Sequence, residues 1–394
     1  MKELLKYAKE MQQNGSIDRD VLEYRYNICK KILPSLKQFD DPNINLTTEV
    51  SYNESIKMVG EFFGSIDPEL ESEFHNIVSQ DTNDISYHMP KPKNYDFLMD
   101  LPEEIGHTVK ITPIEGELKT ANDYFYKTSG SSSAYNYTKL KLNGHINDVN
   151  TIAHEFGHRM SLSKGAYFGF GETTSILAEL KLYDYYEENG ILSKEELFDV
   201  KKIKFTPYLY KIAVPTIVQK NIQNIIKSGE NIDEATLRNY IESLDPKSPD
   251  RYAMEFAQKE HEVLDPAMYQ GFEYIEGVLL ASHLKKEGVN YTSLLTKFAH
   301  CTDNKDIMDL FSSELGIDVE VVNGELRIGD SAIDTLVADF DEELKADKKQ
   351  EKNIWSQTIK TTEQTTRESD ISSSKKQVEK LLEERQKTKI KAIE

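Results

Sequence analysis

The chain has 394 residues, of which 68 are Asp or Glu and 48 are Lys or Arg, so its formal net charge is -20. A surface of this charge repels polyanions, and we therefore expect no nucleic-acid partner. Two cysteines, Cys29 and Cys301, are too few for a disulfide framework and too far apart in sequence for a thiolate metal site.

The N-terminal residues lack the features of a targeting signal. Charges at Lys2, Glu3, Lys6 and Lys9 interrupt any apolar run that could serve as the core of a signal peptide. No stretch approaches the roughly 18 consecutive apolar residues that a membrane-spanning helix needs. These features predict a cytoplasmic protein without a membrane span, and export by a route that needs no signal peptide is the alternative.

The composition divides the chain near residue 345. Apolar residues recur at helical spacing from about Asp18 to Leu344, which predicts a mainly α-helical domain over residues 1–345. Residues 346–394 hold 12 basic and 9 acidic residues, a net charge of +3, which leaves -23 for the domain. We predict a charged tail over 346–394, helical or disordered, with docking of an unknown partner as an alternative role. Breaks between helices are predicted at prolines 34, 42, 68, 90, 92, 207, 246 and 266.

One segment departs from the helical pattern. Lysine alternates with leucine from Lys139 to Leu142, so Tyr137–Asn143 is predicted to be a strand with one apolar face. A Gly/Ser-rich loop precedes it at residues 128–133, and Asn143-Gly144 is a turn signal. Asn147 or Asp148 can then cap a helix. A strand, a turn and a helix start therefore come directly before the next motif.

The sequence HEFGH at residues 154–158 is the strongest chemical signal in the chain. Residues i and i+4 of a helix share a face, so His154 and His158 can hold one Zn²⁺ ion. Glu155 then faces the water at the open coordination position and can act as general base. The motif predicts a hydrolytic zinc site.

A catalytic zinc site needs a third protein ligand, and the next helix offers one. Gly165, Gly169 and Gly171 break the chain after the HEFGH helix and permit it to return. Glu172 begins the following helix, and Glu179 lies two turns further on. We favour Glu172 as the third ligand of one zinc ion per chain, with Glu179 as the alternative.

These segments resemble the M3 metallopeptidases, specifically the oligoendopeptidase F-like enzymes. Leu142–Met160 is similar to the family's strand, turn and zinc helix, and Glu172–Glu179 is similar to its third-ligand helix. Further similar segments follow the family order at residues 51–63, 128–134, 271–282 and 304–319. The resemblance covers about residues 20–344 and implies a gluzincin-type, two-lobed helical metallopeptidase with a small β-sheet beside the HExxH helix.

The chain also departs from this family in three respects. The step from His158 to Glu172 is 14 residues, shorter than the family usually has, and Ser161 stands where members often carry another histidine. Little precedes residue 20, so the N-terminal lobe is reduced. We therefore expect a more open substrate cleft than in oligopeptidases.

The resemblance also implies residues that stabilise the oxyanion. The family uses a downstream cluster of His and Tyr side chains for this purpose, and His261, Tyr269 and Tyr274 are the candidates here. One family tyrosine aligns with Phe272, so the choice between Tyr269 and Tyr274 stays open.

The sequence thus predicts a zinc-dependent endopeptidase in which Glu155 activates a water molecule. We expect a peptide substrate to pair with the strand Tyr137–Asn143 by β-augmentation. The alternatives are an effector or toxin protease with one protein target, a catalytically silent M3-like protein that binds peptides, and a helical carboxypeptidase.

Overall fold

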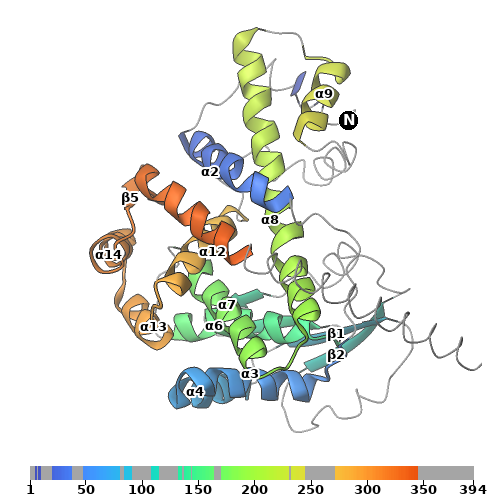
Figure 1. Ribbon diagram of the computed structural model, residues 1–394, viewed down its shortest axis with the longest axis vertical. Coiled ribbons are helices and arrows are strands. Elements are labelled where there is room, and N and C mark those ends of the chain that lie inside the picture. Colours follow the sequence, from blue (N-terminus) through green and yellow to red (C-terminus); the bar gives the residue numbers. More distant parts are fainter. Residues whose placement is uncertain are drawn as a thin grey trace, which may run out of the picture. The chain divides into compact units, whose positions relative to one another are not determined.

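The computed structural model in Figure 1 describes residues 5–6, 8–9, 20–37, 48–79, 84–90, 108–114, 132–134, 137–142, 144–163, 170–229, 232–244 and 271–344. The chain divides into two compact units, Met1–Glu342 and Glu343–Glu394. Almost all of the described residues belong to the first unit. The predicted tail lies outside the described residues.

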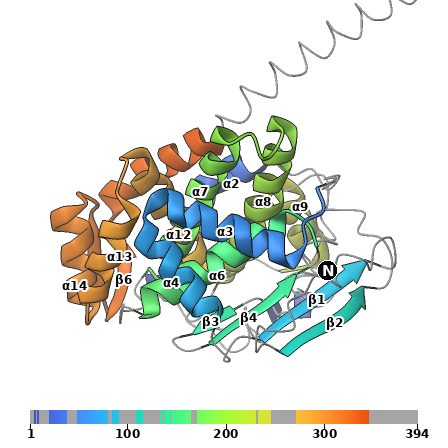
Figure 2. The same ribbon diagram turned by 90° about the horizontal axis from the view of Figure 1, so that it is seen from below.

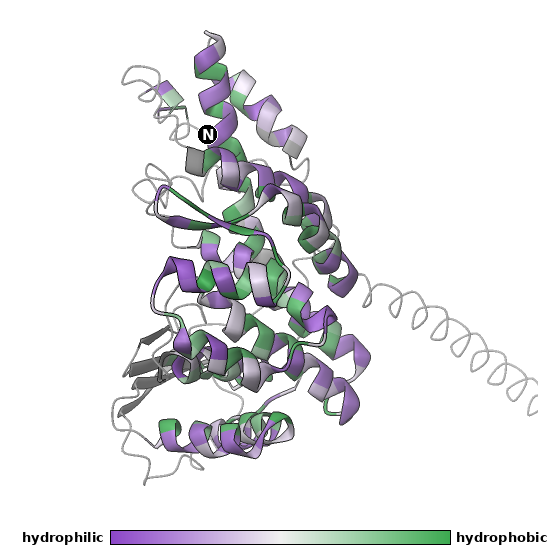
Figure 3. Cartoon of the chain, turned by 90° about the vertical axis from the view of Figure 1, so that its left-hand side faces the viewer, coloured by the Kyte–Doolittle hydropathy of each residue, from purple (hydrophilic) through white to green (hydrophobic). Residues whose placement is uncertain are grey.

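The first unit is mainly helical in its described part, as the apolar periodicity predicts. None of the described helices combines the length and apolar character that a membrane crossing requires. Most helices carry both hydrophobic and hydrophilic residues along their length, as Figure 3 shows. The helices are α2 (Asp20–Leu36), α3 (Tyr52–Ile66), α4 (Pro68–Val78), α6 (Asn147–Ser163), α7 (Glu172–Glu188), α8 (Lys194–Ser228), α9 (Glu234–Leu244), α12 (Phe272–Lys286), α13 (Tyr291–His300) and α14 (Asn304–Asp309), a π-helical turn (Leu310–Glu314) and a helix over 330–344.

Local sequence signals set several helix ends. Ser51 caps α3 by accepting a hydrogen bond from the backbone N–H of Glu54, whose carboxylate accepts one from the N–H of Ser51 in return. Ser193 and Glu196 repeat this capping box at the start of α8. Gly229 ends α8 in the left-handed conformation, with φ +75°.

Two of the predicted proline breaks are wrong. Pro34 lies inside α2, and the 35-residue helix α8 continues through Pro207. A proline in a helix removes one backbone hydrogen bond, at a penalty of about 3 kcal/mol. Apolar side chains of α8 on both sides of Pro207, from Phe205 to Val218, are buried, and this packing outweighs the local penalty. Pro68, in contrast, starts α4 as its first residue.

Four strands form a sheet in the order β2-β1-β4-β3. Strand β1 (Asp84–Pro90) pairs in parallel with β2 (Thr108–Ile114) and with β4 (Tyr137–Leu142), and β3 (Ser132–Ala134) pairs antiparallel to β4. The strand predicted at Tyr137–Asn143 is therefore present, but it is an inner strand with partners on both sides. A separate hairpin joins β5 (Val319–Val322) to β6 (Glu325–Ile328).

The apolar face of β4 anchors the HEFGH helix. Leu140 and Leu142 are fully buried, and β4 and β3 both contact α6, which lies against the sheet in Figure 2. On α6 itself, Ile152, Phe156 and Met160 are fully buried. Helix α7 packs on α6 and also against α12, so α6, α7 and α12 form consecutive layers that begin at the sheet.

A buried polar network joins α12 to α2 and β6. The Tyr24 hydroxyl donates to Glu276 Oε1 at 2.6 Å and accepts from the Ile328 N–H at 2.9 Å. Glu276 is buried, and this burial raises the pKa of its carboxyl to about 8, although Tyr24 and the Arg25 guanidinium act in the opposite direction. The carboxyl is therefore largely protonated at neutral pH.

Glu276→Gln should flatten the pH dependence of stability. Folding raises the pKa of Glu276, so the protonated carboxyl favours the folded state. This contribution to the free energy of unfolding is complete below the ordinary glutamate pKa and is lost as the pH rises through about 8. Glutamine still accepts the Tyr24 hydrogen bond without titrating. Thermal unfolding of the metal-free protein should show a smaller fall in Tm between pH 5 and pH 8 for the variant than for the wild type. The exposed control Glu188→Gln should follow the wild type, and equal falls for Glu276→Gln would contradict this account.

Candidate metal centre

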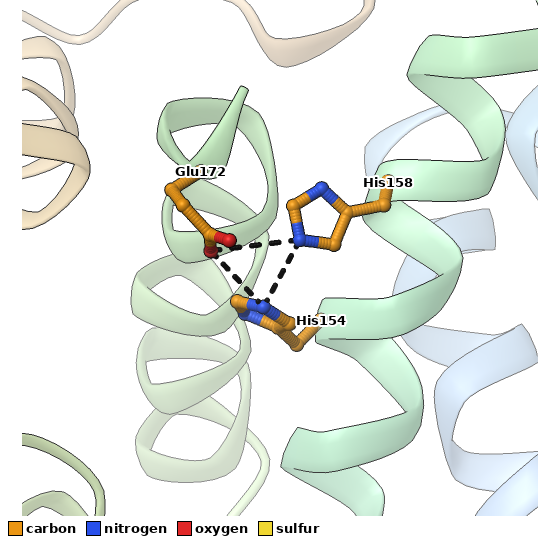
Figure 4. Close-up of side chains that lie close together, drawn as sticks. All are labelled: His154, His158 and Glu172. Atoms are coloured by element: carbon orange, nitrogen blue, oxygen red, sulfur yellow. Dashed lines mark hydrogen bonds and ion pairs between the residues drawn. The ribbon is translucent and has the colours of Figure 1, made fainter. Parts of the chain in front are cut away.

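Three side chains from α6 and α7 converge on one point, as Figure 4 shows. The Nε2 atoms of His154 and His158 lie 3.2 Å apart. Glu172 Oε2 lies 3.3 Å from the Nε2 atom of His154 and 3.5 Å from that of His158. In the part of the chain that the structure describes, these three residues form the group of donors that could hold a metal ion.

Helix geometry and close packing place the three donors. His154 and His158 are one turn apart on α6, and Glu172 is the first residue of α7. A Cβ atom on Gly157 would lie 3.0 Å from Ser175 Cα, so the glycine of HEFGH permits the backbone of α7 to approach. Ser161 strengthens the same contact, because its hydroxyl hydrogen bonds with that of Thr174 at 2.8 Å.

Helix α12 holds Glu172 from the other side. A Cβ atom on Gly277 would lie 2.6 Å from Glu172 Cβ and 3.0 Å from its carbonyl carbon. Real Cβ atoms do not approach this closely, so only glycine fits at this crossing. The third donor is therefore positioned by a tertiary contact rather than by its own helix.

Glu179 contacts the opposite edge of the His154 ring. Its Oε1 atom lies 2.5 Å from His154 Nδ1, whereas the other donors surround Nε2. Glu179 is fully buried, and the same oxygen lies 3.1 Å from Lys204 Nζ. An ion bound at Nε2 is out of its reach, so the alternative assignment of Glu179 as third ligand does not fit this arrangement. Glu179 instead contacts the ring of one candidate donor, and this contact fixes the orientation and tautomer of the His154 imidazole.

The buried charges of the centre shift the pKa values of their neighbours. Burial and Lys204 lower the pKa of His154, but Glu179 and Glu172 outweigh them and raise it to about 9. Burial raises the pKa of Glu172, but His158 and His154 hold it well below its usual range. In the absence of an ion, Glu172 and Glu179 thus stabilise the protonated, positively charged form of the His154 ring.

The other predicted catalytic residues have different outcomes. Glu155 is buried on α6 and is not one of the three donors. The Tyr274 ring lies 6.1 Å from the His154 ring between centroids, and its buried hydroxyl has no hydrogen-bond partner among the described residues. His261 and Tyr269 lie outside the described residues. Tyr274, the tyrosine candidate within the described residues, therefore lies beside the centre.

Helix α8 contributes two residues that the sequence did not indicate. Lys204 contacts Glu179, and one turn later the Tyr208 ring packs on the Tyr274 ring at 4.6 Å between centroids. Both positions lie more than 20 residues beyond the HEFGH and Glu172 segments. No local motif marks these two positions. Once Glu179 is known to be buried, however, its carboxylate requires a partner cation, and Lys204 is that cation.

Gly277→Ala should weaken metal binding. The added methyl group would collide with Glu172 Cβ and with its backbone, so the start of α7 must move away from the histidines. We expect the affinity for Zn²⁺, measured by competition with a chelator, to fall by about tenfold or more. In Gly64→Ala the new methyl group would meet chiefly the carboxylate end of the Glu71 side chain, which can move, and Glu71 Cβ at 3.4 Å, so this control should bind as the wild type does. An unchanged affinity in Gly277→Ala would contradict the tertiary positioning of Glu172.

Comparison with known proteins leaves the function to be inferred from these residues. No protein-family model, no curated protein and no solved structure matches the chain. The chemistry of the donors and of the groups around them is therefore the basis of the functional conclusion.

Proposed function

We propose that this chain is a zinc-dependent endopeptidase of the M3 type. The observation that carries the proposal is the spacing of the three donor atoms, 3.2, 3.3 and 3.5 Å. Donors bound to a tetrahedral zinc ion at its usual bond lengths lie roughly 3.3–3.5 Å from each other. Charge-assisted hydrogen bonds between the same groups would be shorter, at about 2.7–2.9 Å. Two imidazoles and one carboxylate are also a typical donor set of catalytic zinc, which leaves a fourth position for water or substrate.

The surroundings of the triad support a hydrolytic role. A bound zinc ion supplies Lewis acidity, which polarises a peptide carbonyl and lowers the pKa of water toward 7. Glu155, between the two histidines in sequence, accepts the proton of the attacking water and passes it to the leaving amine. The buried hydroxyl of Tyr274 has no hydrogen-bond partner in the described part of the chain, and in this mechanism it donates to the carbonyl oxygen as negative charge develops there.

The sheet beside α6 offers an edge for an extended peptide. Strand β4 has β1 and β3 on its two sides, so the pairing expected along Tyr137–Asn143 would compete with existing strands. Strand β3 is the outer strand of the described sheet on this side, and it contacts α6. We therefore transfer the proposed β-augmentation from β4 to Ser132–Ala134. Pairing through the backbone tolerates many substrate sequences.

Zinc content is the first test of the proposal. The protein dialysed against a zinc buffer should retain one zinc ion per chain, measured by elemental analysis. His154→Ala removes one of three donors and should lose most of the metal. The control His300→Ala removes an exposed histidine at the end of α13 and should retain it. A His154→Ala sample with full zinc occupancy would show that the ligands are assigned incorrectly.

Glu155→Gln should separate metal binding from turnover. Glutamine keeps the size of the side chain but cannot accept a proton, so zinc should stay while hydrolysis falls by at least ~10²-fold. The assay is cleavage of a quenched random-sequence peptide library by zinc-loaded protein. Wild-type turnover by the variant would rule out Glu155 as the base. A wild-type protein that holds zinc but leaves the whole library intact would rule out a broad endopeptidase.

A further inference from the structure

We propose that Lys204 of α8 is a positioning residue of the metal centre, which holds His154 in place through Glu179. This inference rests on the proposed zinc site and adds to it a residue from a third helix. Lys204 touches neither a donor atom of the triad nor the reacting groups. Its effect should therefore be on how well the site holds the ion.

The contacts form a chain from α8 to the ligand. Lys204 Nζ lies 3.1 Å from Glu179 Oε1, and the same oxygen lies 2.5 Å from His154 Nδ1. The side chains of the lysine, glutamate and histidine are 18%, 0% and 9% exposed. Water therefore cannot replace the contact at Glu179, and each link is a charge-assisted interaction in a poorly solvated setting.

The second oxygen of Glu179 makes Lys204 necessary. Among the described residues, Glu179 Oε2 is buried without a hydrogen-bond partner, and the contacts of this carboxylate with His154 and Lys204 are both made by Oε1. Without Lys204, the carboxylate would be held by His154 alone and could rotate about its terminal bond. A rotation would take the acceptor out of line with Nδ1–H, and the imidazole would lose the partner that fixes its orientation.

The charges of the centre lead to the same conclusion. With a divalent ion in place, Glu155, Glu172 and Glu179 contribute three negative charges against two positive ones. Lys204 adds a positive charge in direct contact with Glu179, whose other partner among the described residues is the His154 ring. A buried carboxylate with no counter-charge is strongly destabilising.

The test compares the Zn²⁺ affinity of Lys204 variants by competition with a chelator. Lys204→Met should lower the affinity by about tenfold, the lower end of the effect of losing a ligand's partner. Lys204→Arg keeps the charge and should recover most of the loss. The matched control is Lys202→Met, because Lys202 lies on the same helix and its ammonium packs over the Phe198 ring instead. Wild-type affinity in folded Lys204→Met would overturn the proposal.

A double-mutant cycle with Glu179→Gln separates positioning from a general effect on the fold. If Lys204 acts through Glu179, adding Lys204→Met to Glu179→Gln should change Zn²⁺ affinity by less than about twofold. A further tenfold loss in the double variant would overturn the proposal. This comparison also applies if Lys204→Met alone does not fold, because the double variant leaves no buried unpaired carboxylate at position 179. If the wild type itself binds no zinc, the proposed function fails first, and the two failures are distinguishable.

Discussion

The contact of α7 with two helices at once is the constraint on which the metal centre depends. Helix α6 carries two donors at a fixed spacing, but the third donor has to be brought to them from another element. Gly157 removes the side chain that would keep α7 from α6, and Gly277 removes the one that would keep α12 from Glu172. The donor positions are thus a product of backbone packing. A change of a few tenths of an ångström at either crossing moves one candidate donor relative to the others.

A second constraint comes from the number of carboxylates near the centre. Glu155 and Glu179 are buried and Glu172 is only partly exposed, yet a protein interior accepts such groups only when they have partners. The partners lie on different helices: the imidazoles on α6 and the ammonium of Lys204 on α8. The ion pair between Lys204 and Glu179 therefore attaches α8 to α7, and α7 is one of the helices that the two glycines bring together. Hydrophobic packing places the helices, and the charges select how their side chains are oriented.

The parts of this arrangement that follow from local sequence were predictable, and those that need distant contacts were not. The HEFGH helix and the strand before it follow from the spacing of their apolar residues, the Glu172 helix follows from the glycines that precede it, and the structure contains all three. The inner position of β4 depends on β1, about 50 residues earlier, and no local pattern reports it. Lys204 and Tyr208 lie in one long helix, but Pro207 between them indicated a helix break. No sequence pattern therefore placed this segment beside the site. His261 and Tyr269 belong to the segment 245–270, outside the described residues.

If the three donors hold an ion, as proposed, their division between two helices links metal binding to folding. Two donors belong to one helix, so their mutual distance survives as long as α6 does. Glu172 joins them only while α7 is packed between α6 and α12, and a site with two imidazoles alone binds an ion much more weakly than one with three donors. The packing that brings Glu172 to the histidines adds a certain free energy to the binding of an ion. By linkage, an ion bound to the three-donor site stabilises the same packing by that free energy. Ionisation of the buried Glu276 would act against this packing at high pH, because burial disfavours the charged carboxylate on the same helix. On the proposed assignment, metal affinity and the ionisation of Glu276 would then be coupled through α12, which carries both Gly277 and Glu276.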